Sequence, residues 1–228
     1  MNSEILQQIR EARGQRKPVA LVTALDDGRQ RVVSRDHDAD DTLTPILEEA
    51  FRFDRSGVHL VPEGEFFVNI YNPPLRLVII GAVHIAQALI AIAKGAGYDA
   101  VVIDPRVAFA TAERFPDVAV HADWPDEVLP RVGIDARTAF VALTHDPKID
   151  DPAIHAALRS KAFYIGALGS KRTHATRVAR LKQAGFSDAE IGRIHAPIGL
   201  DIGAQGPAEI AIAIMAQVTS VLRRGSGQ

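Results

Sequence analysis

The apolar positions between residues 76 and 106 predict a strand, a tight turn, a helix and a second strand. Residues 77–80 are a continuous apolar run, which is typical of a parallel strand covered on both faces. Gly81 breaks this run, and apolar residues then recur at helical spacing until residues 100–103 form a second run. Asp104 follows, where a dinucleotide-binding βαβ unit places the acid that meets a ribose hydroxyl. The pattern therefore predicts a βαβ unit.

Strand and helix patterns continue to alternate after residue 106. We expect strands over residues 118–121, 138–143 and 163–168, and helices over residues 107–115, 125–132, 151–158, 171–184 and from 207 onward. Strands that alternate with helices through short connections pack as a mostly parallel, doubly wound sheet with right-handed crossovers. The predicted fold class is therefore α/β, with a Rossmann-like doubly wound sheet.

The first 72 residues have instead the pattern of a small α+β N-terminal domain. Helices are expected over residues 3–13 and 43–51, the second after an acidic loop at 36–41, and strands over residues 18–25, 30–34, 58–61 and 66–71. An Asp-Asp-Gly turn joins the first two strands, which is a hairpin signal. Because the Asn-Pro-Pro run at residue 72 cannot continue a strand ladder, we expect domains at residues 1–72 and 73–228.

Composition and charge narrow the class of protein. The 228 residues are 47% hydrophobic and 24% charged, with a formal net charge of −2, as in ordinary globular proteins. This charge gives no electrostatic reason to expect nucleic acid or an anionic membrane as a partner. The start of the chain lacks the apolar core of a signal peptide, and the apolar run at 210–216 is too short to span a bilayer. We therefore expect a cytoplasmic location.

The sequence contains no cysteine. This excludes disulfides, thiolate zinc sites, iron–sulfur clusters and a cysteine nucleophile within this chain.

Candidate ligand chemistry lies in four stretches that follow predicted strands, because ligands of open α/β sheets bind beyond the carboxyl ends of the strands. The first stretch runs from Gly81 to Ala86 and includes His84. Gly81 fits the first glycine of a dinucleotide fingerprint, but Val83 stands where a glycine lets the pyrophosphate approach the backbone. A phosphate could still bind the helix N-terminus in another register. The alternative is a plain turn with His84 exposed.

The second stretch contains Thr144, His145 and Asp146, with two further aspartates at 150 and 151. A hydroxyl, an imidazole and carboxylates together suit acid–base work or a hard metal ion. In the alternative interpretation, Asp146 and Asp150 cap the turn, and Asp151 with Pro152 begins the next helix. We favour this alternative for Asp151.

The third stretch is the most specific candidate anion site. Gly166 and Gly169 would let a ligand approach the backbone, Ser170 is a natural N-cap, and Lys171 and Arg172 add cations at a helix N-terminus. The same predicted helix also carries arginines at positions 177 and 180. A solvated basic helix face is the alternative, although it does not account for the glycines.

The fourth stretch is the glycine-rich loop at 195–203, which includes Gly199 and Asp201. A loop this apolar usually folds inward over something. His195 and Asp201 could contact a ligand, or Asp201 could bind its own backbone. The last helix then begins with Pro207 as its first-turn proline.

Six motifs in register resemble the xanthine dehydrogenase accessory protein family (XdhC/CoxI). They are GAVHIA at 81–86, DPR at 104–106, LTHDP at 143–147, YIGALGSKR at 164–172, HAPIGLDIG at 195–203 and PAEIA at 207–211. The resemblance implies a role in maturing molybdenum hydroxylases such as xanthine or carbon monoxide dehydrogenases. It implies that the protein binds the molybdenum cofactor, a molybdopterin that also occurs as a dinucleotide, helps it become sulfurated and passes it to the apoenzyme. A sulfurase is a further partner that this role would allow.

Two departures from the family bear on the chemistry. Val83 stands where the family commonly has glycine, and residues 1–71 lack the family's Gly-rich, cysteine-containing motif and its Ser-Pro-Arg element. Without cysteine this chain carries no persulfide and no thiolate ligand for molybdenum. We therefore expect a non-catalytic chaperone that holds the cofactor through hydrogen bonds.

We expect Ser170, Lys171 and Arg172 to hold the pterin phosphate. Polar pterin atoms or molybdenum oxo groups would meet His84, His145, Asp146 or Asp201. The complete predicted set of cofactor-binding residues is Gly81, His84, Asp104, Arg106, Thr144, His145, Asp146, Gly166, Gly169, Ser170, Lys171, Arg172, Gly199 and Asp201.

Two other functions stay open at this point. An NAD(P)-dependent oxidoreductase would use Asp104 on the ribose, although Val83 counts against the usual pose. An interaction protein would grip a partner through its N-terminal domain. The long apolar final helix would also suit a homodimer.

Overall fold

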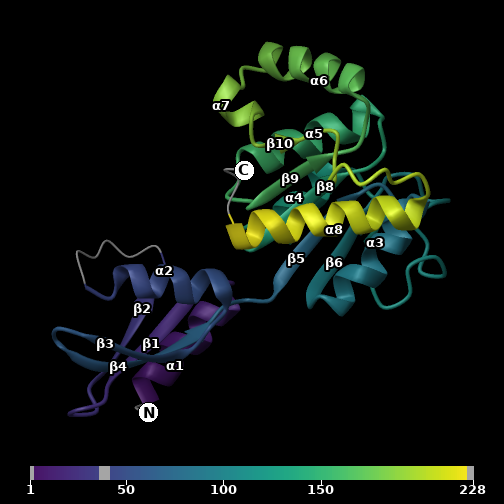
Figure 1. Cartoon of the computed structure of the whole chain (residues 1–228). Helices are drawn as coiled ribbons and strands as arrows, with labels where there is room; N and C mark the ends of the chain where they lie inside the picture. The colour runs from purple at the N-terminus through teal and green to yellow at the C-terminus, as the bar shows by residue number, and fades with distance from the viewer. Residues whose placement is uncertain (1–2, 36–41, 225–228) are drawn as a thin grey trace. The chain divides into compact units, whose positions relative to one another are not determined.

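Two consecutive prolines separate the two parts of the chain. The computed structural model describes residues 3–35 and 42–224, and the chain divides between Pro73 and Pro74 into two compact units (Figure 1). The expected acidic loop at 36–41 lies outside the described residues. Each unit has a sheet and a core of its own.

The second unit is built on a six-stranded parallel sheet. Its strands are β5 (Leu75–Ile80), β6 (Tyr98–Ile103), β7 (Ala119–His121), β8 (Thr138–Ala142), β9 (Tyr164–Ala167) and β10 (Ile194–His195). They lie in the order β7-β6-β5-β8-β9-β10, the strand order of the doubly wound dinucleotide-binding fold. The predicted α/β class and Rossmann-like sheet are confirmed.

The register places the carboxyl ends of the central strands level with one another. Ile80 pairs with Ile103 on one side and with Ala142 on the other, and Ala142 pairs with Ala167. The turns that follow β5, β6, β8 and β9 therefore emerge along one edge of the sheet, which is where open α/β folds bind ligands.

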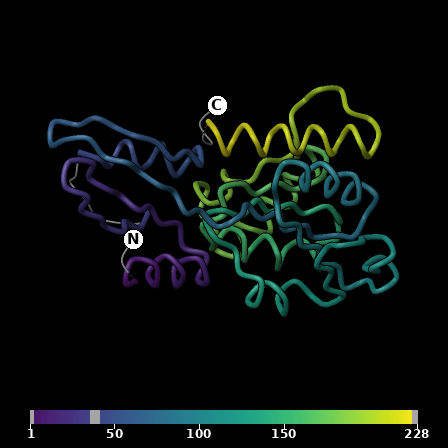
Figure 2. The backbone as a smooth tube through the Cα atoms, turned by 90° about the horizontal axis from the view of Figure 1, so that it is seen from below, coloured from purple at the N-terminus to yellow at the C-terminus, as the bar shows by residue number. Residues whose placement is uncertain are grey.

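Helices cover both faces of this sheet. They are α3 (His84–Gly95), α4 (Pro125–Val132), α5 (Pro147–Leu158), α6 (Lys171–Gln183), the short α7 (Asp188–Ile191) and α8 (Pro207–Arg224). Leu77 and Ile79 of β5 pack in the core formed with α3 and α8, whereas Val78 and Ile80 pack with α4, α5 and α6. Figures 1 and 2 show α8 lying along one side of the sheet beside α3. Burial on both faces explains the continuous apolar run in β5.

The expected helix over residues 107–115 is wrong, because this segment forms turns. Nη1 of Arg114 donates to the carbonyl oxygens of Ala82 and Phe109, both at 2.8 Å. The Arg106 guanidinium lies 4.6 Å from the centre of the Phe109 ring. These contacts fold the segment back on the turn after β5, and they replace the hydrogen bonds of a helix.

The expected start of α5 at Asp151 is also wrong, because the helix begins at Pro147. Asp146 is its N-cap and accepts a hydrogen bond from the Lys148 amide at 2.9 Å. An Asp-Pro pair occurs at both positions, and the structure uses the first as the helix start. Asp151 instead lies inside α5, where its carboxylate pairs with Arg180.

The first unit is a four-stranded antiparallel sheet with one helix on each face. Its elements are α1 (Ser3–Gly14), β1 (Val19–Ala24), β2 (Gln30–Ser34), α2 (Thr44–Phe53), β3 (Gly57–Val61) and β4 (Gly64–Tyr71). The strands lie in the order β2-β1-β4-β3. Leu47 and Phe51 of α2 pack against Val22 of β1, while Ile9 of α1 packs against Leu21 on the other face. The predicted α+β character of the N-terminal part is confirmed.

Across residues 3–35 and 42–224, the helices are all too short or too polar to cross a bilayer.

Helix α8 offers a matched test of the core. Ile214 is fully buried and Ile212 is 52% exposed, and both lie on the same helix. We expect Ile214→Ala to lower the free energy of unfolding by about 2–5 kcal/mol, since it leaves a cavity against β5 and α3. Ile212→Ala should change it by less than about 0.5 kcal/mol. Urea denaturation checks both variants, and equal losses would contradict this packing.

Candidate functional site

Three strand-end turns touch one another at the carboxyl edge of the parallel sheet. Gly81 has φ +108°, and a Cβ atom there would lie 2.6 Å from Cγ2 of Thr144. Gly169 has φ +141°, and its Cβ would lie 3.7 Å from Nδ1 of His145. The turns after β5, β8 and β9 are therefore in contact, and they bring together four of the predicted site residues. The two glycines are needed here for their positive φ angles and for the close approach.

The turns after β5 and β6 are joined by the carboxylate of Asp104. This side chain is fully buried. Oδ2 accepts a hydrogen bond from the Ala82 amide at 2.8 Å and another from Nη2 of Arg106 at 2.7 Å. Oδ1 accepts from the amide and from Nε of Arg106, at 3.0 and 2.9 Å. Both oxygens are thus occupied by the protein itself.

Two opposing effects act on the pKa of Asp104. Burial raises it, but the hydrogen bonds from Arg106 and from the Ala82 amide outweigh burial, so that the pKa lies below its ordinary value. The hydrogen bonds to Asp104 in turn raise the pKa of Arg106, and the carboxylates of Asp146 and Asp150 add to this effect. Arg106 is therefore a fixed cation at the edge of the site.

The turn after β8 is organised by a second buried carboxylate, that of Asp150 in the first turn of α5. The side chain of Asp150 is 1% exposed. It accepts hydrogen bonds from the Thr144 hydroxyl at 2.6 Å and from the His145 amide at 3.0 Å. His145 has φ +66°, an uncommon conformation for a residue other than glycine. Asp150 holds this backbone in place, and the His145 side chain is exposed.

Among residues 3–35 and 42–224, no cluster of three or more His, Asp or Glu side chains is arranged to hold a metal ion. The carboxylates near His145 instead accept hydrogen bonds from the backbone and side chains of the turn. Asp146 caps α5 and Asp150 binds the Thr144–His145 turn. This agrees with the interpretation in which these two residues cap the turn.

The helix N-terminus after β9 has the predicted cap. Ser170 Oγ accepts a hydrogen bond from the Thr173 amide at 3.1 Å, so Ser170 is the N-cap of α6. The side chains of Lys171 and Arg172 are exposed. A ligand at this turn would thus meet two exposed cations and the positive end of the helix dipole.

Gly166 and Gly199 have a packing role that the sequence did not reveal. A Cβ at Gly166 would lie 2.5 Å from Cδ1 of Ile198, and a Cβ at Gly199 would lie 3.1 Å from Ala213 of α8. The missing side chains let the 196–206 loop lie against β9 and α8. This corrects the expectation that Gly166 leaves room for a ligand, because Ile198 fills that space.

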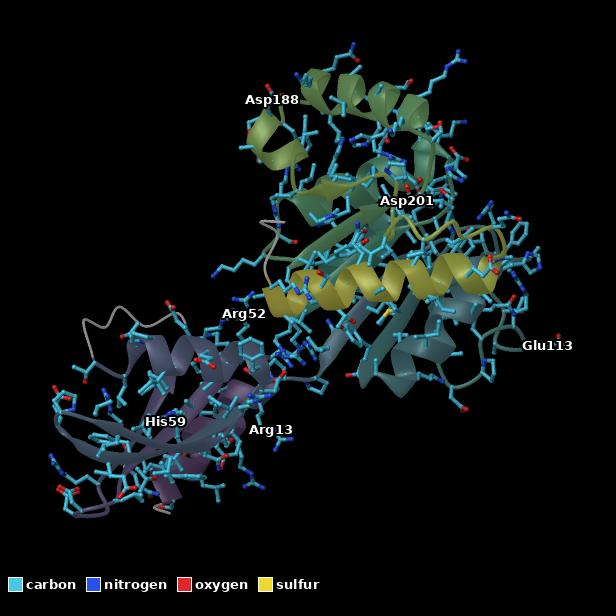
Figure 3. All side chains as sticks on the ribbon, in the orientation of Figure 1. Arg13, Arg52, His59, Glu113, Asp188 and Asp201 are labelled. Atoms are coloured by element: carbon cyan, nitrogen blue, oxygen red, sulfur yellow. The ribbon has the colours of Figure 1, made fainter. Side chains whose placement is uncertain are left out.

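The same loop is anchored by one amide side chain. Oε1 of Gln217 accepts hydrogen bonds from the Tyr164 hydroxyl at 2.6 Å and from the Gly199 amide at 2.8 Å. His195 stacks on the Tyr164 ring, with 4.8 Å between the ring centres. Asp201, labelled in Figure 3, is exposed on this loop, and His84 is exposed at the start of α3.

Arg177 is a buried residue that the sequence analysis did not single out. A solvated basic face of α6 was the alternative to an anion site there, and for Arg177 this alternative is wrong, because the residue is only 2% exposed. Its Nη2 donates to the Leu168 carbonyl at 3.1 Å and lies 3.9 Å from Oδ2 of Asp150. The sequence signal was available in the spacing, because Arg177 and the buried Leu181 are four residues apart and share a helix face.

Two features disfavour NAD(P) in its usual pose. Val83 is the N-cap of α3 and its side chain packs against the core, where a pyrophosphate would require a glycine. The carboxylate of Asp104, the predicted ribose ligand, is buried and fully hydrogen-bonded within the protein.

Comparison with known proteins shows which family this chain belongs to. Residues 77–218 match the XdhC Rossmann domain, which is more than half of the chain. The chain belongs to the XdhC family. The resemblance seen in the six motifs is thereby confirmed, and the matched segment contains the whole site from Gly81 to Asp201.

Two XdhC-related proteins and one solved structure are similar to the chain. The molybdenum cofactor insertion chaperone PaoD of Escherichia coli K12 is 34% identical over 151 residues, which cover 66% of this chain and 41% of PaoD. In Bacillus subtilis 168, a protein described as a probable xanthine dehydrogenase subunit is 30% identical over 168 residues, which cover 73% of this chain and 48% of that protein. The chain therefore spans less than half the length of each of these relatives.

The solved structure is that of a xanthine dehydrogenase from Bacillus halodurans. It superposes with a TM-score of 0.67 at 27% sequence identity, and the match covers 99% of this chain and 65% of that one. The similarity in fold thus extends over both units of the present chain.

The variant Asp104→Asn tests the hydrogen bonds that the buried carboxylate of Asp104 accepts. We expect a loss of about 1–3 kcal/mol in the free energy of unfolding at pH 7, because the amide cannot accept all four hydrogen bonds. Asp99→Asn is the matched control, since Asp99 lies on the same strand and is exposed. Folding lowers the pKa of Asp104 below its value of about 3.9 in the unfolded chain. The ionised carboxylate therefore stabilises the fold above about pH 3.9, and this stabilisation is lost as the pH falls through the pKa of the folded state.

The difference in the free energy of unfolding between wild type and Asp104→Asn should accordingly be constant near neutral pH and shrink below about pH 4. Thermal and urea unfolding between pH 3 and pH 8 measure it. A difference that grows on acidification would contradict the assignment.

Proposed function

We propose that this XdhC-family protein binds the molybdenum cofactor and takes part in its insertion into a molybdenum hydroxylase apoenzyme. The observation that carries the proposal is the convergence of hydrogen-bonding groups and cations at one edge of the sheet, on three touching turns within the family-matched segment. The similarity to a molybdenum cofactor insertion chaperone supports it. The cofactor is cargo here and not a resident group of the protein.

The residues present suit a phosphate-bearing pterin. Phosphate groups bind helix N-termini and cations, and α6 offers both through its first turn, Lys171 and Arg172. Polar edges of a pterin would find the exposed side chains of His84, His145, Asp146 and Asp201 as hydrogen-bonding partners. Gly169, at φ +141°, lets the backbone come close to the bound group. The dinucleotide form of the cofactor belongs to the same proposal.

The role that fits this chain is to hold and transfer the cofactor. Sulfuration needs a persulfide donor, and the chain has no cysteine, so a separate sulfurase would supply the sulfur. Asp104, Arg106 and Asp150 act as positioning residues in this proposal, because they fix the turns and leave the exposed groups to meet the ligand.

The test is retention of the cofactor. The protein is co-expressed with molybdenum cofactor synthesis, purified, and analysed for molybdenum by mass spectrometry and for pterin by fluorescence. We expect wild type to retain both, and Lys171→Ala/Arg172→Ala to retain at least about tenfold less, since charge-assisted hydrogen bonds are each worth about 1.5–3 kcal/mol.

The matched control is Lys94→Ala/Arg131→Ala. It removes the same charge from exposed positions in the last turns of α3 and α4, at the opposite edge of the sheet. The proposal fails if wild type retains neither molybdenum nor pterin. Titration with NADH distinguishes this proposal from the oxidoreductase alternative, because only the oxidoreductase is expected to bind NADH.

A further inference from the structure

A pocket of about 240 Å³ lies between the start of α5 and residues 172–180 of α6. Its lining includes Asp150, Arg172, Thr173, Thr176, Arg177 and Arg180. A water molecule takes about 30 Å³ of liquid, so this volume admits a tetrahedral oxyanion. The pocket opens beside Arg172 and Thr176, whose side chains are exposed.

The buried wall of this pocket is the guanidinium of Arg177. Only Nη2 has a hydrogen bond in the described structure, to the Leu168 carbonyl. Nε and Nη1 are buried and have no acceptor among the described residues. Buried N–H groups are nearly always paired, and a buried cation without acceptors is costly, so this side chain calls for an acceptor that the protein does not supply.

Asp150 does not fill that role. Its carboxylate is 3.9 Å from Arg177, beyond hydrogen-bond range, and its two oxygens already accept from Thr144 and His145. Burial raises the pKa of Asp150 more than its partners lower it. Burial also lowers the pKa of Arg177, although arginine is protonated in proteins at neutral pH.

The charges around the pocket favour an anion. Arg180 is paired with Asp151 on the neighbouring helix. The lining then has the two positive charges of Arg172 and Arg177, and the carboxylate of Asp150 is the negative charge that opposes them. The hydroxyl of Thr176 adds a donor beside them, now bonded at 3.3 Å to the Arg172 carbonyl.

We propose that this pocket is an oxyanion subsite that takes a phosphate monoester group, with Arg177 at its base and Arg172 and Thr176 at its rim. The inference rests on the proposed function, in which the phosphate belongs to the pterin cargo. It moves the principal phosphate contact about two helical turns beyond the N-cap, from Ser170 and Lys171 to the buried guanidinium of Arg177. Lys171 does not line the pocket.

The first experiment uses the full 228-residue chain and inorganic phosphate, followed by isothermal titration. We expect wild type to bind phosphate, Arg177→Met to bind at least tenfold more weakly, and Thr176→Val to show a smaller loss. Lys182→Met is the matched control, because it removes one charge from the same helix outside the pocket, and it should bind as wild type does. Equal binding by wild type and Arg177→Met, or no binding by wild type, would overturn the proposal.

A second variant covers the case in which Arg177→Met does not fold. Asp150→Asn removes the competing negative charge and keeps an oxygen acceptor, so phosphate should bind several-fold more tightly. If Arg177 served only to balance Asp150, phosphate affinity would not rise. Circular dichroism and thermal unfolding accompany each titration.

Phosphorylated and dephosphorylated pterin distinguish a phosphate monoester from free phosphate. The phosphorylated compound should bind more tightly than inorganic phosphate, and the dephosphorylated compound should not respond to Arg177→Met. If the Arg177 variant retains as much molybdenum as wild type after co-expression, this subsite is wrong while the proposed function stands. If phosphate binding depends on Arg177 but wild type retains no cofactor, the proposed function fails and the oxyanion pocket remains.

Discussion

The pairing of β5 with both β6 and β8 is the constraint on which the site depends. Because Ile80 is level with Ile103 and with Ala142, the turns that follow these strands must share one edge. Parallel strands buried on both faces have little freedom to slip, since a shift by one residue would turn each apolar side chain toward the opposite helix layer. The packing of β5 therefore fixes where the polar turn residues meet.

Two buried carboxylates then hold the turns at this edge of the sheet in place. Asp104 joins the turns after β5 and β6, and Asp150 shapes the turn after β8. Their environments differ, because Asp104 has Arg106 within hydrogen-bond distance and Asp150 has only a distant guanidinium. The pKa of Asp104 is accordingly lowered, while that of Asp150 is raised. Exposed groups such as His145 are left to meet a ligand.

The spacing of apolar residues and the positions of glycine and proline predicted the architecture, because strands buried on both faces and helices that follow glycine turns have local sequence signatures. The family followed from motifs at the strand ends. Contacts between distant segments had no such signature. Arg114 reaches back to Ala82 and converts an expected helix into turns, and Ile198 fills the space beside Gly166. The spacing of Arg177 to Leu181 indicates a shared helix face, but the partners of the Arg177 guanidinium depend on how α6 packs against α5.

Gln217 has a consequence for how cargo could leave the protein. Its single oxygen accepts from both Tyr164 and Gly199, and burial raises the pKa of Tyr164, which keeps its donating proton. The 196–206 loop is thereby joined to β9 and α8 at once. Moving the loop would break the hydrogen bond between Gly199 and Gln217 and would separate Gly199 from Ala213. Under the proposed function, we therefore expect a cofactor to enter and leave beside the turns after β5 and β8, where His84 and His145 are exposed.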